Sequence, residues 1–263
     1  MFTGDYLRKT SEWRKALDGG YVASSVNDIL NILRECNSRV TFFILGELYE
    51  WYPETIESIE EDGHEIAYHT HKHEIIMDEQ VFVDSLKASQ SFVSKFAPKG
   101  FRAPDIFLPK NCLSILKKQR FLYDSSIYSC LPPKAFDKIF EVPVSSYSLI
   151  KRKCTHSFPS PLSLKRCLTE IPFGSGYYAA LFGRKTLYFI KKFNKLGRPA
   201  ILFIHSWQII KPRKRAFPNM SYLAKNPWYL PYLFELKNTF IHFIKNLKVQ
   251  PILEGLEGGD ISG

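Results

Sequence analysis

Residues 63–73 contain four of the seven histidines of this 263-residue chain. Imidazole is the commonest protein ligand for transition metals, and several imidazoles together can hold one ion. His69 and His73 are four residues apart, so a helical turn beginning at Thr70 would place both rings on one side and turn His71 elsewhere. Because the cluster directly follows a strand-like stretch, it favours a metal site over a polar loop of solvated histidines.

Further candidate residues stand where apolar stretches end, namely Arg102, Asp124 and His205. In α/β proteins the functional groups gather beyond the carboxyl ends of the strands. A second site histidine could move protons, and an arginine could orient a carboxylate through a bidentate pair. Asp124 is more typical of a turn residue than of a catalyst, and His64 is more typical of a structural residue.

The elements that would position these residues alternate in type. We expect helices over 26–37, 47–61 with a restart at Pro53, 78–96, 111–119, 184–196 and 231–247. We expect strands over 39–45, 64–68, 121–124, 198–205 and 249–253, a strand end at 100–104, and short strands near 141–144 and 170–172. Alternation of helix and strand indicates an α/β fold with a parallel sheet.

The composition, 45% hydrophobic and 24% charged, is ordinary for a soluble globular protein. We expect one domain over residues 1–253 and a flexible, glycine-rich tail over 254–263. The net charge of +10 permits contact with nucleic acid, an acidic polymer or an anionic membrane face. No nucleic-acid motif accompanies the charge, so no nucleic-acid partner is expected, and the basic run 211–215 is interpreted as a solvated loop.

The cysteines and the chain start bear on the cellular compartment. Five widely spaced cysteines without a CxxC pair indicate free thiols, which suit a reducing compartment. The chain start lacks the apolar core of a secretory signal, and no apolar run is long enough to span a bilayer. We therefore expect a cytoplasmic protein; the oligomeric state stays open.

The order of the motifs resembles that of a known family. The stretch 41–46, followed by 63–73, is similar to the polysaccharide deacetylases with a NodB-homology domain (carbohydrate esterase family 4). The stretch 101–104 resembles the family's Arg-x-Pro motif, and 202–205 its Leu-x-x-His motif. Three further stretches, 123–127, 174–178 and 205–207, are closest to a subgroup linked to exopolysaccharide gene clusters.

This resemblance implies a fold, a reaction and a set of roles. The fold would be a distorted (β/α) barrel of about seven parallel strands. The reaction would be metal-dependent removal of N-acetyl groups from an amino-sugar-containing polysaccharide or its precursor. The metal would be a divalent ion, zinc first among them, on His69 and His73. The implied catalytic residues are Asp5 as base, Arg102 holding that base and His205 as general acid; the implied substrate contacts are Pro104, Tyr177 and Trp207, the last equally compatible with a core position.

The first acidic motif departs from the family pattern. The family has a base and a metal ligand there, whereas residues 2–6 contain only Asp5. A one-residue shift in alignment would make Asp5 the ligand and leave no base. Glu12 or Asp18 could substitute, or a longer chain could supply a complete first strand. Two alternative functions are kept. The resemblance also allows hydrolysis of another non-peptide C–N bond, such as a cyclic or linear amide, and loss of the first acidic motif would leave carbohydrate binding without catalysis.

Overall fold

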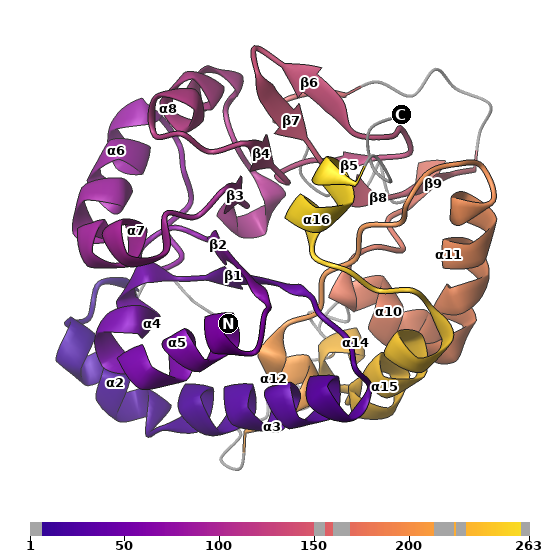
Figure 1. Ribbon diagram of the computed structural model, residues 1–263, viewed down its shortest axis with the longest axis horizontal. Helices are drawn as coiled ribbons and strands as arrows, with labels where there is room; N and C mark the ends of the chain where they lie inside the picture. The colour runs from indigo at the N-terminus through magenta and orange to yellow at the C-terminus, as the bar shows by residue number, and fades with distance from the viewer. Residues whose placement is uncertain (1–6, 150–155, 160–168, 213–223, 225–229, 259–263) are drawn as a thin grey trace.

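A six-stranded sheet forms the centre of the computed structural model, which describes residues 7–149, 156–159, 169–212, 224 and 230–258 (Figure 1). The strand order is β1-β2-β3-β4-β7-β6. The parallel strands are β1 (Thr41–Ile44), β2 (Glu65–Tyr68), β3 (Gly100–Phe101), β4 (Tyr123–Asp124) and β7 (Ile139–Glu141), and β6 (Lys134–Phe136) runs antiparallel to β7. The predicted α/β class with a mostly parallel sheet is confirmed.

Two small sheets and two extended segments continue the ring of strands. Strand β5 (Tyr128–Ser129) pairs in parallel with β8 (Val144–Ser145), and β9 (Tyr147–Ser148) pairs antiparallel with β10 (Glu170–Ile171). The prediction of a strand over 198–205 is wrong, because this segment is extended but makes only isolated bonds, such as Ser145 N–H to the Ile201 carbonyl at 3.0 Å. In Figure 1 this segment and the chain before α16 (Ile252–Glu257) lie between β8 and β1.

The end of the chain also differs from expectation. The strand predicted over 249–253 is wrong, because Ile252 already begins α16 and its N–H donates to Thr41 Oγ1 at 2.8 Å. Helix α16 continues through residue 257 and buries Ile252 and Gly255, so part of the predicted tail is helical. The division at residue 253 stays a prediction.

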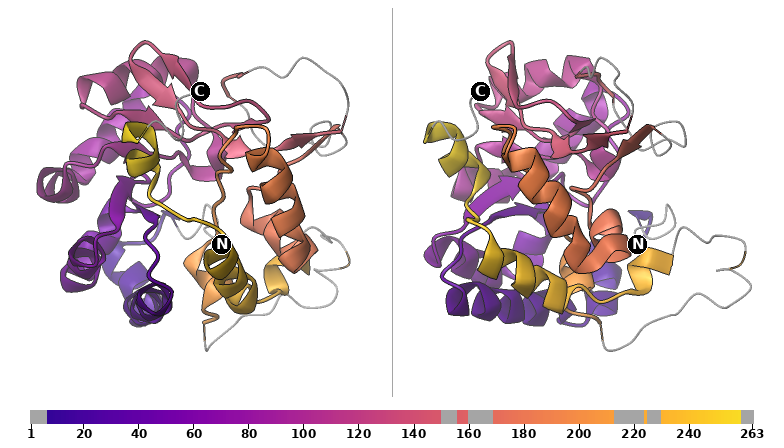
Figure 2. Two further views of the ribbon diagram at one scale, coloured as in Figure 1. Left: turned by 45° about the vertical axis from the view of Figure 1, so that its right-hand side comes forward. Right: turned by 90° about the vertical axis from the view of Figure 1, so that its right-hand side faces the viewer.

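Helices cover the outer face of the sheet (Figures 1 and 2). They are α2 (Ser11–Asp18), α3 (Tyr21–Glu35), α4 (Gly46–Trp51), α5 (Pro53–Glu61), α6 (Glu79–Ala88), α7 (Gln90–Phe96), α8 (Leu113–Lys118), α10 (Gly176–Phe182), α11 (Thr186–Asn194), α12 (Ser206–Ile209), α14 (Leu230–Leu233) and α15 (Lys237–Asn246), with 3₁₀ turns η1 (Pro104–Ile106), η2 (Lys110–Cys112) and η3 (Gly183–Lys185). The predicted restart at Pro53 is confirmed, since proline suits the first turn of α5. The helix predicted over 78–96 is instead two helices that meet at Ser89.

Both faces of the sheet are packed. Tyr68 and Phe101 belong to a buried cluster with side chains of the covering helices, such as Phe82 and Phe92. On the other face a smaller cluster joins Tyr123, Val142, Ile201 and Ile252 to Phe43 of β1. A parallel sheet buried on both faces holds its strands firmly, so the loops beyond their carboxyl ends start from fixed points.

Two observations concern the cysteines and membrane spans. The thiols of Cys36 and Cys112 are free, but Cys130 is disulfide-bonded. The expectation that all five thiols are free is therefore wrong.

Within the described parts of the chain, no helix has the length and apolar character needed to cross a bilayer.

Candidate active site

The rings of His69 and His73 lie together beyond the end of β2. Their centroids are 5.1 Å apart with an interplanar angle of 76°. His69 Nδ1 lies 2.6 Å from the carbonyl oxygen of Arg102, which can only accept, so Nδ1 carries the proton and Nε2 keeps its lone pair. The predicted helical turn is wrong: Thr70 and His73 have positive φ angles of 67° and 68°, and bends rather than a helix bring the rings together.

Buried hydroxyl groups fix this histidine loop from behind. Ser85 Oγ accepts from the His71 N–H at 2.8 Å, and Ser89 Oγ lies 3.2 Å from His71 Nδ1. The Tyr68 hydroxyl lies 2.9 Å and 3.0 Å from the same two serine oxygens. His71 therefore points away from the other two rings, as predicted, and serves to hold the loop.

The environment of both rings, His69 and His73, favours the neutral imidazole. Burial lowers the pKa of His69 well below its usual value, with a further decrease from the neighbouring His73. Burial also lowers the pKa of His73, against an opposing effect of Asp105. Neutral imidazole is the form that binds metal ions, so the two rings are prepared for that role.

Arg102 leaves the end of β3 and lies inside the ring of strands. Its Nε–H donates to the Ser125 carbonyl at 3.0 Å, and its Nη2 donates to Ser125 Oγ at 2.6 Å. The guanidinium carbon lies 4.1 Å from the centroid of the Phe43 ring. Burial lowers the pKa of Arg102 to about 10, so the side chain remains a cation at neutral pH.

His205 approaches the same place from the opposite side. Its Nδ1 lies 3.0 Å from Gln208 Oε1, so Nδ1–H donates to this amide and Nε2 is left for chemistry. The Gln208 amide in turn donates to the Gly176 carbonyl at 3.0 Å, which fixes its orientation. Trp207 stacks on the imidazole with centroids 5.1 Å apart. Burial lowers the pKa of His205 to about 4, so the resting ring is neutral.

A buried carboxyl pair lies behind this group and was missed from the sequence. Asp124 and Glu141 are direct partners in the β4–β7 register and are 0% and 1% exposed. Burial raises the pKa of Asp124 to about 6, and burial with the neighbouring Asp124 raises that of Glu141 well above its usual value. Asp124 also accepts from Ser126, whose oxygen accepts from the Ala103 N–H next to Arg102. The pair therefore supports the turn that presents Arg102.

The structure brings together four of the predicted site residues. His69 contacts His73 and Arg102. Beyond the effect of burial, the nearby His73 and Arg102 lower the pKa of His205, and His205 lowers that of His69. Pro104 is buried at the start of η1, two residues after Arg102, Trp207 stacks on His205, and Tyr177 lies in the first turn of α10. Asp5 lies outside the described residues.

The two substitutes considered for the acidic motif do not join the histidines. Glu12 is exposed on α2, and Asp18 accepts from the Tyr52 hydroxyl at 2.7 Å and from the Val22 N–H at 3.2 Å. His64 is buried and accepts from the Val40 N–H at 3.3 Å, in line with the structural role predicted for it. Within the described ranges, no three His, Cys, Asp or Glu side chains are grouped closely enough to hold a metal. His69 and His73 thus fit two positions of a metal site.

Several comparisons match this chain to known deacetylases. Residues 16–122 match the sequence model of the polysaccharide deacetylases. FGM2 of Gibberella zeae, named as a peptidoglycan deacetylase-like protein, is 32% identical over 182 residues, 65% of this chain and 52% of that protein. A peptidoglycan-N-acetylglucosamine deacetylase of Bacillus cereus is 28% identical over 126 residues, 46% of this chain and 45% of that protein. The chain spans about half the length of these curated relatives.

A solved structure extends the likeness to the fold. The crystal structure of a protein from Mycobacterium smegmatis, described as a polysaccharide deacetylase, superposes with a TM-score of 0.50 at 22% identity, covering 86% of this chain and 79% of that chain. The two proteins share the class of fold, which in this chain is an α/β architecture around a mostly parallel sheet. Within that class, this chain is similar to the polysaccharide deacetylases, whose sequence model matches residues 16–122.

Proposed function

We propose that the protein is a metal-dependent hydrolase that removes N-acetyl groups from an amino-sugar-containing polysaccharide or its precursor. The observation that carries the proposal is the meeting of His69, His73, Arg102 and His205 beyond the strand ends. The printed names of the relatives, which refer to peptidoglycan deacetylation, support the same class of reaction.

Each residue receives a role from its chemistry. His69 and His73 would hold a divalent ion, with zinc the expected one, through nitrogens that carry no proton. Such an ion, when bound, polarises the acetamide carbonyl and acidifies a water molecule. Asp5 would take the proton of the attacking water, and Arg102 would keep that carboxylate ionised and oriented. His205 is neutral at rest with its proton on Nδ1, so it would first take up a proton from solvent at Nε2 and then deliver it to the leaving amine, while Asp5 would release the proton of the water to solvent.

The substrate would lie against apolar and aromatic groups at the same mouth. Pro104 lies two residues after Arg102, and Trp207 presents its ring beside His205. Tyr177 is the second residue of α10, next to Gly176, whose carbonyl accepts from Gln208. Aromatic rings present a large apolar face with a polar handle, so Trp207 and Tyr177 suit the apolar faces of a glycan.

A catalytically inactive carbohydrate-binding relative is the second candidate. It is favoured by the lack of a third potential metal ligand in the described part of the chain. Hydrolysis of another non-peptide C–N bond would use the same groups with a different substrate wall. A cytoplasmic location stays a prediction. The disulfide at Cys130 removes the argument from free thiols that supported it. Fractionation of the cells that make the protein would test the location.

Metal analysis together with a deacetylase assay separates these candidates. We expect the purified protein to bind about one divalent ion per chain, and His69→Ala and His73→Ala to abolish both binding and hydrolysis. His242→Ala, on α15, is the matched histidine control and should change neither. Stoichiometric metal in the double variant would overturn the site assignment. Metal binding without hydrolysis of any acetylated amino-sugar polymer would instead favour the inactive relative.

A further inference from the structure

The excess of basic over acidic residues comes from one stretch of sequence. Residues 171–234 contain eleven Lys and Arg residues and no Asp or Glu. The remaining residues contain 25 basic and 26 acidic side chains, so they are nearly neutral. The net charge of +10 therefore belongs to one part of the protein and is not spread over its whole surface.

Helix α11 and the turn before it carry much of this charge on one face. Counting from Tyr188, basic residues recur three and four positions away on either side, which places them on the same side of the helix. The exposed basic residues of this side are Arg184, Lys185, Lys191, Lys192 and Lys195. Together with Tyr188 they are called the α11 face here. The opposite side buries Ile190 and Phe193. In the right-hand view of Figure 2, α11 lies in front and faces the viewer.

Large apolar side chains are exposed among these cations. Tyr188 is 64% exposed at the centre of the α11 face, and Lys192 lies over its ring at 5.8 Å. Leu181, at the end of α10, is 53% exposed, and Leu196, just after α11, is 59% exposed. A face that served only to be hydrated would gain nothing from these three side chains, since exposed apolar area is unfavourable in water.

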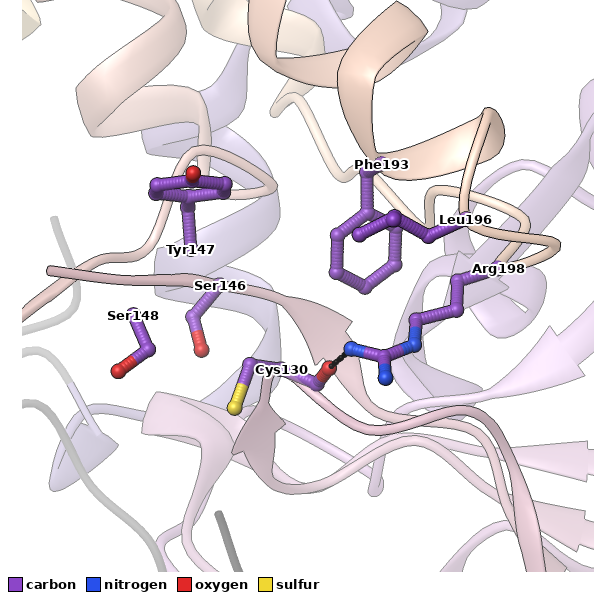
Figure 3. A pocket seen from close by; sticks show the side chains of 7 residues that line it. All are labelled: Cys130, Ser146, Tyr147, Ser148, Phe193, Leu196 and Arg198. Carbon is purple, nitrogen blue, oxygen red and sulfur yellow. Dashed lines mark hydrogen bonds between the residues drawn. The ribbon is translucent and has the colours of Figure 1, made fainter. Parts of the chain in front are cut away.

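A small cavity adjoins the same face (Figure 3). It has a volume of about 160 Å³, and its lining includes the apolar side chains of Tyr147, Phe193 and Leu196. Arg198 lies beside Phe193 and Leu196 and is oriented by a 2.8 Å bond from its Nη1 to the Cys130 carbonyl. Leu196 belongs both to the cavity and to the edge of the α11 face, so an apolar hollow with a guanidinium opens beside the row of lysines.

We propose that the α11 face docks the protein on the surface of an anionic lipid bilayer. The lysines and arginines would lie at the level of the head groups, while Leu181, Tyr188 and Leu196 enter the boundary between head groups and acyl chains. Binding of this kind combines apolar burial with attraction to acidic lipids. An acidic polysaccharide would satisfy the cations but would leave the exposed leucines in water, so the lipid surface is the better match. This proposal is independent of the proposed hydrolysis.

Vesicle co-sedimentation of the full chain tests the proposal. We expect binding to phosphatidylcholine vesicles that contain phosphatidylglycerol, weak binding to phosphatidylcholine alone, and a decrease with added salt. Reversing three charges, in Lys191→Glu/Lys192→Glu/Lys195→Glu, should weaken binding at least about 100-fold, since each surface cation contributes about fivefold. Leu181→Ser/Leu196→Ser should weaken binding about tenfold or more while keeping the net charge.

A matched control distinguishes this face from net charge alone. Lys87→Glu/Lys110→Glu/Lys118→Glu changes the charge equally at exposed positions on α6, η2 and α8. Vesicle binding should survive in this variant, and an equal loss there would overturn the proposal. It would also be overturned if Leu181→Ser/Leu196→Ser bound vesicles as wild type and dextran sulfate competed fully, because the face would then recognise anionic polymers. Circular dichroism melts confirm that each variant folds.

Discussion

Two imidazoles of the site are oriented by the same device. Each donates Nδ1–H to a fixed oxygen, the Arg102 carbonyl for His69 and the Gln208 amide for His205, and so presents Nε2 to the centre. The identities of both histidines could be predicted from short motifs. Their partners could not, because a backbone carbonyl leaves no trace in the sequence and Gln208 lies in a turn whose shape depends on α10.

At the residue scale, His205 gives a clear test of general acid catalysis. We expect His205→Ala to keep metal content and fold but to lose turnover on the order of 10²–10⁴-fold, the usual contribution of a general acid or base. Steady-state kcat on an acetylated amino-sugar oligomer measures the loss. His156→Ala, which removes an imidazole bonded to the Pro132 carbonyl, is the control. Unchanged kcat in His205→Ala would exclude the residue from the reaction.

At the scale of elements, the helices were easier to predict than the strands. Helix α3 and the α4–α5 break follow from apolar spacing and from Pro53. The break at Ser89 could not be predicted in this way. The Ser89 hydroxyl bonds to Tyr68 and His71, which are distant in sequence, and these contacts accompany the non-helical backbone at Ser89. The apolar run 198–205 has the composition of a strand. It makes isolated backbone hydrogen bonds to neighbouring segments, however, instead of the regular ladder of bonds that defines a strand pair.

The junction of α4 with the α6–α7 break positions the histidine loop. Gly46 N–H donates to the Thr70 carbonyl at 3.0 Å, and a Cβ at Gly46 would lie 2.1 Å from Ser89 Oγ and 2.6 Å from Ser89 Cβ. We therefore expect Gly46→Ala to lower the free energy of unfolding by about 1–3 kcal/mol, the usual cost of overpacking. Urea denaturation measures it.

A second substitution tests whether a clash between the new Cβ at residue 46 and the Ser89 side chain causes the loss of stability. Ser89→Gly removes the atoms that a Cβ at Gly46 would meet, so Gly46→Ala/Ser89→Gly should lose less stability than the sum of the two single variants. The double-mutant cycle isolates this coupling energy. Simple additivity of the two changes would mean that Gly46 is needed for another reason.

At the scale of the whole molecule, the alternation of elements predicted the α/β class, and one short motif cluster predicted the edge of the sheet that carries the site. The alternation alone did not predict a closed ring of strands, which only the family resemblance implied. This closure depends on extended segments that are held by side-chain bonds, such as the Leu253 N–H to Glu65 Oε2 at 3.0 Å. The pairing of Asp124 with Glu141 is equally hidden, because it depends on which strand lies beside β4.

This carboxyl pair should shape the pH dependence of global stability. Asp124 Oδ2 and both carboxyl oxygens of Glu141 receive no hydrogen bond from the described residues, so a proton on one carboxyl is what can join the two. The neighbouring charge is that of Arg102, with the Tyr123 and Tyr128 phenols and the Cys112 thiol nearby. Burial raises the pKa of Asp124 from 3.8 to about 6 in the folded protein. The folded state therefore binds this proton more tightly than the unfolded state does.

The sign of the effect follows from that difference. The stabilisation is complete below the unfolded pKa and is lost as the pH rises through the folded pKa, so the window runs from about pH 4 to beyond pH 6. Over this pH range, the contribution of Asp124 to the free energy of unfolding should fall by on the order of 3 kcal/mol. Asp124→Asn keeps an acceptor for Ser126 and removes the titration, so the variant should flatten this decline in urea denaturation at a series of pH values. Asp137→Asn, which alters an exposed carboxylate paired with Lys117, should keep the wild-type slope. If Asp124→Asn and wild type declined in parallel, Asp124 would not take up a proton over this pH range, and the decline would belong to other groups.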